Sequence, residues 1–380
     1  MYDRADGKQV DQTKLQQRIG SATAEVVRRQ IECGIDVIND GEFPKVGYST
    51  YVTDRLTGFD GASEQIATAE MQDFPEYWQR LFGEPAMEGF THLKTPACTG
   101  PIKLKDPTAV QRDVANFKAA LKGVQPQDMF MTAASPGVIS VFLNNRHYPS
   151  EEAYLAAIAE AMKPEYEAIA NAGFVLQVDC PDLAMSRQMG PMAAQDMTHF
   201  RRWLGMHVEA LNQALANVPA DRLRMHICWG NYEGPHVRDV PLRDIVDIIL
   251  TAKPSAISIE ASNPRHAHEW KIFEDVKLPP GKMLIPGVID STTNFVEHPE
   301  LVAQRILNYA KLVGRENVMA GTDCGFGTFV GLYTVEPKVT WRKFESLAEG
   351  ARLASAELWG QAAGRRTREE VREGTRSEMA

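Results

Sequence analysis

Residues 224–260, RMHICWGNYEGPHVRDVPLRDIVDIILTAKPSAISIE, contain the pattern that decides the fold. The segment opens and closes with short apolar runs, 224–228 and 256–260, neither of which alternates strictly between polar and apolar residues. Such runs are typical of strands that are buried on both faces of a sheet. Between them, residues 241–252 have the apolar spacing of a helix. A strand, a helix and a second strand in this order predict parallel neighbours in a sheet covered by helices.

The same alternation extends toward both ends of the chain. It predicts further strands at 35–39, 128–133, 174–178, 283–289 and 317–321, and further helices near 20–33, 151–172, 200–216, 298–313 and 340–357. Strands that are each followed by a helix predict an α/β fold of the (β/α)8 TIM-barrel type, which typically spans about 250 residues. One strand of the eight is missing from the pattern. Because the chain begins almost directly in a helix, we expect the first strand to be absent and the sequence to start late.

Two segments do not follow the alternation. Residues 58–100 form a long insertion that contains Trp78 and other aromatic residues. Such an insertion is either a lid or hairpin over the barrel mouth, or a decoration that covers only barrel helices, and the sequence leaves both open. Residues 363–380 are a mixed-charge tail, typical of a frayed helix. We therefore predict one catalytic domain at 1–362, followed by the tail.

Composition excludes several classes of protein. The 380 residues carry a formal net charge of −9 and are 44% hydrophobic, as in ordinary globular proteins. No apolar run approaches the roughly 18 residues that span a bilayer, and the polar start offers no signal peptide. Basic clusters that would bind nucleic acid are absent. The five scattered cysteines favour a reducing cytoplasm over a disulfide framework. The composition leaves the oligomeric state open.

Four residues at predicted strand ends have the chemistry of metal ligands. His226 and Cys228 point to the same face, because residues i and i+2 of a strand share a face. Glu260 ends the next strand, and Cys324 follows the last one in Gly321-Thr322-Asp323-Cys324-Gly325. In a barrel, all four converge on the carboxyl-terminal rim where active sites lie. Each cysteine taken singly is typical of inert packing, but the four together predict a zinc site.

Two further carboxylates fall on the same rim. Glu42 follows the first predicted strand, and Asp179 ends the strand at 174–178. A carboxylate at this position binds a cationic amine, orders a hydroxyl or takes part in proton transfer. An ion pair with a neighbouring barrel residue is the alternative.

This set of residues resembles the catalytic domain of cobalamin-independent methionine synthase and its stand-alone relatives, over about residues 20 to 330. The family's zinc pattern is present as His226-Ile227-Cys228, Ile259-Glu260 and Asp323-Cys324-Gly325. The resemblance implies a barrel like those of methionine synthase and uroporphyrinogen decarboxylase, with Zn²⁺ held by His226, Cys228, Glu260 and Cys324. It also implies that Glu42 contacts an amino-acid thiol such as homocysteine and that Asp179 holds its amine.

The sequence departs from methionine synthases where the methyl donor binds. Thr292 replaces a histidine that helps to protonate the departing folate, and Phe326 and Phe329 occupy a run where the synthases carry basic residues. The sequence around Tyr48 is more similar to that of the stand-alone relatives, which include epoxyalkane:coenzyme M transferase, than to that of the methionine synthases. We therefore predict a small, uncharged alkyl or methyl donor. If an epoxide is opened, the hydroxyls of Ser291, Thr292 or Tyr48 are the candidate hydrogen-bond donors to the alkoxide.

The predicted function is thus a zinc-dependent methyl or alkyl transfer to a small thiol, homocysteine, coenzyme M or similar, in which zinc activates the thiolate. Epoxide opening with coenzyme M is the first alternative. A metallohydrolase would use His and Asp ligands, and the pair His266 and His268 is expected on the surface. A decarboxylase of the uroporphyrinogen type needs no metal. A non-catalytic, zinc-stabilised binding protein would keep a closed metal site.

Overall fold

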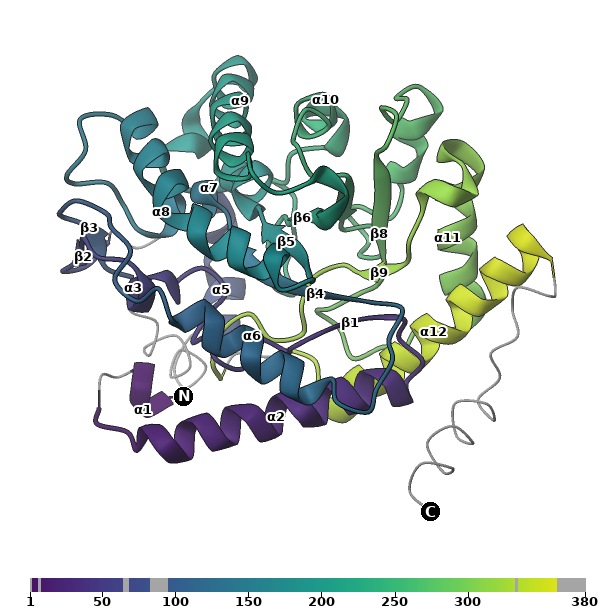
Figure 1. The fold of residues 1–380 in the computed structure, drawn as a ribbon. Coiled ribbons are helices and arrows are strands. Elements are labelled where there is room, and N and C mark those ends of the chain that lie inside the picture. Colours follow the sequence, from purple (N-terminus) through teal and green to yellow (C-terminus); the bar gives the residue numbers. More distant parts are fainter. Residues whose placement is uncertain (1, 6–7, 64–67, 83–94, 332–333, 361–380) are drawn as a thin grey trace.

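Seven parallel strands form one curled sheet (Figure 1). The computed structural model describes residues 2–5, 8–63, 68–82, 95–331 and 334–360. In sheet order the strands are β1 (Val37–Asn39), β4 (Asp128–Ala134), β5 (Val175–Asp179), β6 (Leu223–Ile227), β7 (Ala256–Ile259), β8 (Met283–Ile289) and β9 (Gly321–Thr322). The predicted α/β fold with a parallel sheet is confirmed, and the predicted tail at 363–380 lies outside the described residues.

Helices flank the sheet and connect its strands in chain order (Figure 1). They are α2 (Gln12–Glu32) before β1, then α6 (Ala109–Ala120), α8 (Glu151–Asn171), α9 (Met197–Ala214), α10 (Val246–Ile249), α11 (Pro299–Val313) and, after β9, α12 (Pro337–Trp359). Side-chain oxygens of Asp11, Ser150 and Asp196 accept hydrogen bonds from the first turns of α2, α8 and α9. These caps satisfy backbone N–H groups that have no partner inside the helix, and so define where the three helices begin.

The connections around β7 are less helical than the sequence predicts. The predicted helix at 241–252 is a 3-10 turn, η6 (Leu242–Asp244), followed by the short α10. Ile245, with φ −131° and ψ −15°, interrupts the helical backbone between them. Between β7 and β8 the chain forms another 3-10 turn, η7 (Glu269–Glu274). The sequence analysis also missed α6, whose buried side chains include Val110 and Phe117.

The strands run in register, so the polar residues at their carboxyl ends lie side by side. Asp179 on β5 pairs with His226 on β6, and His226 pairs with Ser258 on β7. Neighbouring residues of a sheet that are in register point to the same face. The three side chains therefore share the inner face at the carboxyl edge of the sheet.

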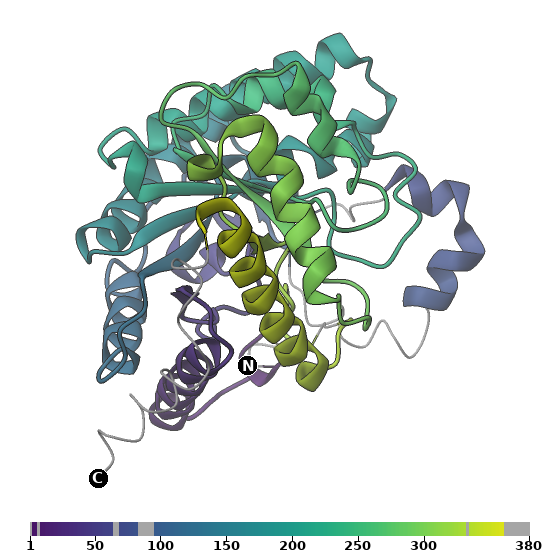
Figure 2. The ribbon, with the colours of Figure 1, turned by 90° about the vertical axis from the view of Figure 1, so that its right-hand side faces the viewer.

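The two edge strands, β1 and β9, are linked by loops and helices. Within the described residues, β1 pairs with β4 alone and β9 with β8 alone. Beyond them, the Val330 N–H donates to the Val46 carbonyl at 3.0 Å, and the Tyr48 N–H donates to the Thr328 carbonyl at 3.2 Å. α11 and α12 pack side by side on β8 (Figure 2). The loops after β1 and β9 are thus joined at the carboxyl edge.

The insertion docks on the loop that follows β6. Its described elements are β2 (Phe59–Asp60), α4 (Ala69–Asp73), α5 (Pro75–Phe82) and β3 (Ala97–Cys98), and the short helix α3 (Val52–Arg55) directly precedes it, whereas residues 64–67 and 83–94 lie outside the described part. Glu70 is fully buried and accepts hydrogen bonds from the Tyr232 hydroxyl at 2.8 Å and the Arg238 N–H at 3.2 Å. The Trp78 and Tyr232 ring centres are 5.1 Å apart. These contacts place α4 and α5 over a rim loop, as a lid would lie.

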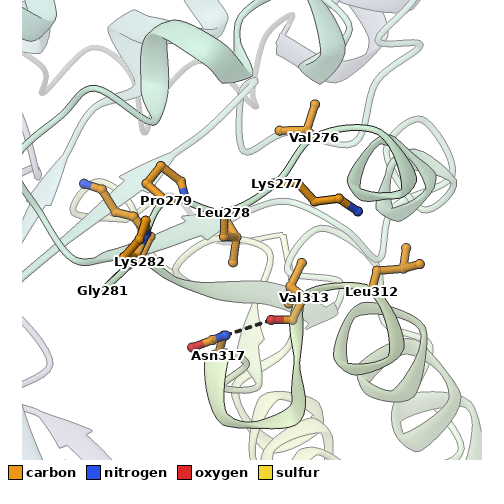
Figure 3. A pocket seen from close by; sticks show the side chains of 10 residues that line it. Val276, Lys277, Leu278, Pro279, Gly281, Lys282, Leu312, Val313 and Asn317 are labelled. Carbon is orange, nitrogen blue, oxygen red and sulfur yellow. Dashed lines mark hydrogen bonds between the residues drawn. The ribbon is translucent and has the colours of Figure 1, made fainter.

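A cavity of about 230 Å³ lies at the opposite, amino end of β8 (Figure 3). Lys282 immediately precedes β8 and donates to the Pro254 carbonyl at 2.6 Å, and Asn317 donates to the Val313 carbonyl at 2.8 Å. None of the predicted site residues lines this cavity. Among the helices that the structure describes, none is both long enough and apolar enough to cross a membrane.

Candidate metal centre

Three of the four predicted metal ligands meet at the carboxyl edge of the sheet. His226 lies on β6, Cys228 directly follows that strand, and Cys324 lies two residues after the end of β9. Their potential ligand atoms lie within 4.8 Å of one another, and the two sulfur atoms are 3.9 Å apart. His226 and Cys228 are buried, whereas Cys324 is partly exposed. One imidazole and two sulfurs in this arrangement have the chemistry of a zinc site.

The imidazole of His226 is oriented toward an additional partner. Its Nδ1 atom lies 3.3 Å from the Ser258 hydroxyl, while its Nε2 atom is buried and has no hydrogen-bond partner. Leaving a buried polar nitrogen unpaired costs free energy, so such groups normally mark a bound water or ion. A histidine that ligates a metal through one nitrogen usually bonds a protein oxygen through the other. The residues present therefore fit a metal ion at this point.

The two cysteine sulfurs are hydrogen-bonded to each other. The hydrogen bond from Cys228 holds the pKa of the Cys324 thiol well below its ordinary value, and the same contact raises the pKa of Cys228. The N–H of Gly230 also donates to the Cys228 sulfur at 3.3 Å. A lowered pKa favours the thiolate of Cys324, the form that binds metals. A metal ion bound by both sulfurs would displace the proton of Cys228.

Glu260, the fourth predicted ligand, lies beside this cluster but outside the group of three. It follows β7, and its Oε1 and Oε2 atoms accept hydrogen bonds from the Trp229 N–H and the Asn263 amide, both at 2.8 Å. Burial, followed by the charge of Asp323, raises the pKa of Glu260 to about 7. Ligation by Glu260 remains a prediction; each of its oxygens accepts one of these hydrogen bonds and keeps a further lone pair for a metal ion.

Asp323 connects the loop of Cys324 to the loop of Glu260, a role that the sequence analysis missed. Its Oδ1 atom accepts hydrogen bonds from the Ala261 and Ser262 N–H groups at 2.8 and 2.9 Å, and its Oδ2 atom accepts from the Asn263 N–H at 2.9 Å. A side chain at Gly287 would come within 2.2 Å of the same carboxylate, so only glycine fits there. Asp323 therefore fixes the two halves of the cluster relative to each other.

We expect Asp323→Asn to weaken both the fold and the metal site. The substitution removes the negative charge that accepts hydrogen bonds from three backbone N–H groups. If the rotamer is kept, the new NH₂ group also points at one or more of these N–H donors. Hydrogen bonds to a charged group are worth about 2 kcal/mol each, so the free energy of unfolding should fall by at least that amount. Urea titration and zinc analysis measure the two effects. Asp196→Asn, at the exposed start of α9, is the control, because asparagine caps helices as well as aspartate does. Unchanged stability and zinc content in Asp323→Asn would contradict this role.

The second polar group of the site is formed by Glu42 and its neighbours. Glu42 has φ 56°, in the left-handed region, and follows Gly41 with φ 71°. Its Oε1 atom accepts a hydrogen bond from the Lys45 ammonium at 2.9 Å and another from the Thr132 hydroxyl. Burial opposes ionisation, but the Lys45 charge and these hydrogen bonds hold the pKa of Glu42 below its ordinary value. Glu42 is therefore an ionised carboxylate in a fixed ion pair. Lys45 and Thr132 were not singled out in the sequence.

Asp179 lies on the inner face next to His226. Its Oδ1 atom accepts a hydrogen bond from the Gln177 amide at 2.8 Å. Burial, followed by the charge of Glu42, raises its pKa to about 7. The Thr132 hydroxyl that donates to Glu42 comes from the residue of β4 that pairs with Gln177 on β5, and Gln177 in turn donates to Asp179. The structure thus connects the two predicted substrate-binding carboxylates through paired positions on β4 and β5.

The predicted hydroxyl donors have different surroundings. Tyr48 packs against Phe142 and Phe329, with ring centres 6.0 and 5.3 Å apart. Burial, followed by the charges of the two cluster cysteines, raises the pKa of its hydroxyl well above its ordinary value. Ser291 and Thr292 instead donate their hydroxyl hydrogens to Asn231 and Asp290, both at 2.8 Å.

One expectation about neighbouring residues was wrong. His266 was expected on the surface, yet it is 2% exposed and contacts Glu269 at 2.8 Å and Asp239 at 3.0 Å. The Trp229 ring packs against it, and of the pair only His268 is exposed. Of the two phenylalanines after Cys324, Phe326 packs against Phe344 of α12, with ring centres 5.4 Å apart, whereas Phe329 packs against Tyr48.

Comparisons with known proteins agree with this geometry. Residues 136–337, more than half of the chain, match the family described as "Cobalamin-independent synthase, Catalytic domain". Methionine synthase of Sulfolobus acidocaldarius is 22% identical over 352 residues, which cover 92% of this chain and 86% of that protein. Methionine synthase of Thermococcus kodakarensis is 20% identical over 359 residues, which cover 94% of this chain and 89% of that protein. A B12-independent methionine synthase from Shewanella, solved with selenomethionine, matches the fold with a TM-score of 0.67, 19% identity and 90% and 88% of the two chains covered. The chain therefore belongs to the family of cobalamin-independent synthase catalytic domains.

Proposed function

We propose that this protein is a zinc-dependent transferase that moves a methyl or small alkyl group to the sulfur of a thiol. The observation that carries the proposal is the convergence of His226, Cys228 and Cys324 at the carboxyl edge of the sheet, with the Nε2 atom of His226 unpaired. Membership of the family and the names of its methionine synthase relatives support the same reaction class. A cytoplasmic location is part of the proposal, supported by five unpaired cysteines.

His226, Cys228 and Cys324 would hold the zinc ion, with Glu260 as the fourth ligand. Zinc in a thiolate-rich site lowers the pKa of an incoming thiol from about 8.5, so that a nucleophilic thiolate forms at neutral pH. Ser258 keeps the imidazole of His226 in place, and Asp323 holds the loops of Cys324 and Glu260 together. The protein thus contributes a fixed donor set before any substrate arrives.

The space next to this donor set has a polar and an apolar side. Glu42 and Asp179 form the polar side, where they can order the part of the thiol substrate that does not react. The packed rings of Tyr48, Phe142 and Phe329 form the apolar side, and the charges of the two cysteines act on the Tyr48 hydroxyl. Apolar rings exclude water from the reacting sulfur and favour an uncharged donor. This arrangement supports a small alkyl or methyl donor rather than a polyanionic one.

Methyl or alkyl transfer is favoured over epoxide opening by the state of the candidate hydroxyls. Opening an epoxide requires a hydrogen-bond donor at the developing alkoxide. The hydroxyls of Ser291 and Thr292 are already donated to Asn231 and Asp290. Tyr48 is then the candidate whose hydroxyl is influenced by the charges of the two cysteines. Epoxide opening with a thiol such as coenzyme M is the second candidate function and would depend on Tyr48.

X-ray absorption at the zinc edge, with and without a small thiol, tests the proposal. We expect one zinc per chain and, after addition of homocysteine or a des-amino thiol, one further sulfur neighbour at about 2.3 Å. A site in which the coordination stays unchanged with every thiol tested would contradict the transferase. It would favour a protein that uses zinc only for stability.

A further inference from the structure

We propose that Lys45 is a specificity-determining residue that makes this site accept thiols without an ammonium group. The inference rests on the proposed thiol transfer and deepens it by naming the substrate class. In an amino-acid thiol, the α-ammonium would need a carboxylate on the polar side of the site. Asp179 and Glu42 are the carboxylates on that side, but the chain supplies Glu42 with an ammonium of its own.

The Lys45 ammonium has all of its hydrogen-bond donors satisfied. It lies 2.9 Å from Glu42 Oε1, 2.7 Å from the Thr132 carbonyl and 2.8 Å from the Thr132 hydroxyl oxygen. The side chain of Lys45 is 8% exposed, while that of Glu42 is 30% exposed. The nitrogen also lies 4.6 Å from the centre of the Tyr51 ring. The lysine is thus held beneath the carboxylate, and the carboxylate faces the site.

The backbone of the loop holds this ion pair in place. The Gly41 N–H donates to the Asn39 side chain at 2.8 Å, and the Glu42 N–H donates to Asp40 at 3.1 Å. The Lys45 N–H donates to the Glu42 carbonyl at 2.9 Å, which closes a turn between the two residues. These bonds hold the backbone of Glu42 in its left-handed conformation, while Lys45 and Thr132 hold its carboxylate.

A second ammonium at Glu42 would be unfavourable for two reasons. Displacing Lys45 would leave a buried charge without its partner. Binding beside it would place a second positive charge close to the first, and the two would repel each other. Asp179 also lies on the polar side of the site, but the charge of Lys45 neutralises part of the combined negative charge of Glu42 and Asp179. The site therefore gains little from the amine of an amino-acid thiol.

The test uses two thiols that differ only in the α-amino group, L-homocysteine and 4-mercaptobutanoate. Calorimetric titration of the zinc-loaded wild-type protein should give similar dissociation constants for both, or a preference for 4-mercaptobutanoate. In Lys45→Met, Glu42 becomes available to an ammonium, so the ratio should shift by about 10- to 100-fold toward homocysteine. Lys45→Arg keeps the positive charge and should keep the wild-type preference.

A double variant separates specificity from a structural defect. Lys45→Met/Glu42→Gln removes the freed carboxylate and should return the ratio to the wild-type value, which damage to the loop would not do. A wild-type preference for homocysteine of more than tenfold, or a ratio that does not move in Lys45→Met, overturns the role of Lys45 alone. If neither thiol binds to the zinc-loaded wild-type protein, the proposed function fails, and this inference fails with it.

Discussion

Cys228→Ser and Cys324→Ser are each expected to lose most of the bound zinc and to lower thiol-transfer activity by about two to three orders of magnitude. Serine preserves the size of the side chain but replaces a soft thiolate by a hydroxyl that stays protonated at neutral pH. The two sulfurs are 3.9 Å apart, and Cys228→Ser also removes the thiol whose hydrogen bond lowers the pKa of Cys324. Metal analysis after gel filtration and a thiol-consumption assay measure the two losses.

Cys33→Ser and Cys98→Ser are the matched controls. Cys33 lies at the end of α2, where its sulfur is 3.7 Å from the Trp341 carbonyl, and Cys98 lies on β3 of the insertion. Neither cysteine is near the cluster at the carboxyl edge. Both controls should keep one zinc per chain. Full zinc in Cys228→Ser and in Cys324→Ser would refute the ligand assignment.

The features that the sequence predicts are those that follow from local periodicity and strand geometry. The i, i+2 spacing of His226 and Cys228 requires only that 224–228 is a strand, and the structure has β6 over Leu223–Ile227. The position of Cys324 near them follows from parallel strands whose carboxyl ends meet at one edge. For the same reason, the sequence predicts that Glu42 and Asp179 face the same space.

The features that the sequence does not reveal depend on contacts between distant segments. Glu42 and Lys45 form an ion pair and are only three residues apart in the sequence. The geometry of the pair, however, is fixed by Thr132 on β4, which bonds both side chains. Asp323 was present in the quoted motif, yet its contacts with 261–263 need the loops after β7 and β9 to be adjacent. The burial of His266 likewise depends on Asp239, which lies in the loop after β6. No periodicity records such contacts.

These distant contacts also determine what the rim can bind. A sequence motif reveals the carboxylates on the rim. The net charge of the site, however, also depends on the buried cations that pair with those carboxylates. Lys45 supplies one such cation under Glu42. A second buried cation, Arg55 at the end of α3, holds together the helices behind the same loop. The same local region thus contains one ion pair that bears on specificity and another that bears on stability.

Arg55→Leu is expected to lower the free energy of unfolding by about 3–5 kcal/mol, the largest effect on stability that we predict. The guanidinium contacts Asp113 of α6 and lies 2.8 Å from Glu165 of α8, and all three side chains are at most 10% exposed. The Tyr51 hydroxyl donates to the same Glu165 at 2.6 Å. Leucine fills part of the volume but leaves two buried carboxylates without a cation. Urea titration at pH 7 measures the change.

The pH dependence of this loss identifies its cause. Burial already raises the pKa of Asp113 against the opposing charge of Arg55, and without the guanidinium that pKa rises further. A group whose pKa is higher in the folded than in the unfolded state favours folding only while it is protonated, so the penalty in Arg55→Leu is present at pH 7 and shrinks as the pH falls toward about 5. Arg112→Leu, on the same α6 helix, breaks an exposed ion pair with Asp106 and should cost less than about 1 kcal/mol with little pH dependence. Equal losses in the two variants, or a loss in Arg55→Leu that does not change with pH, would show that the buried carboxylates are not its source.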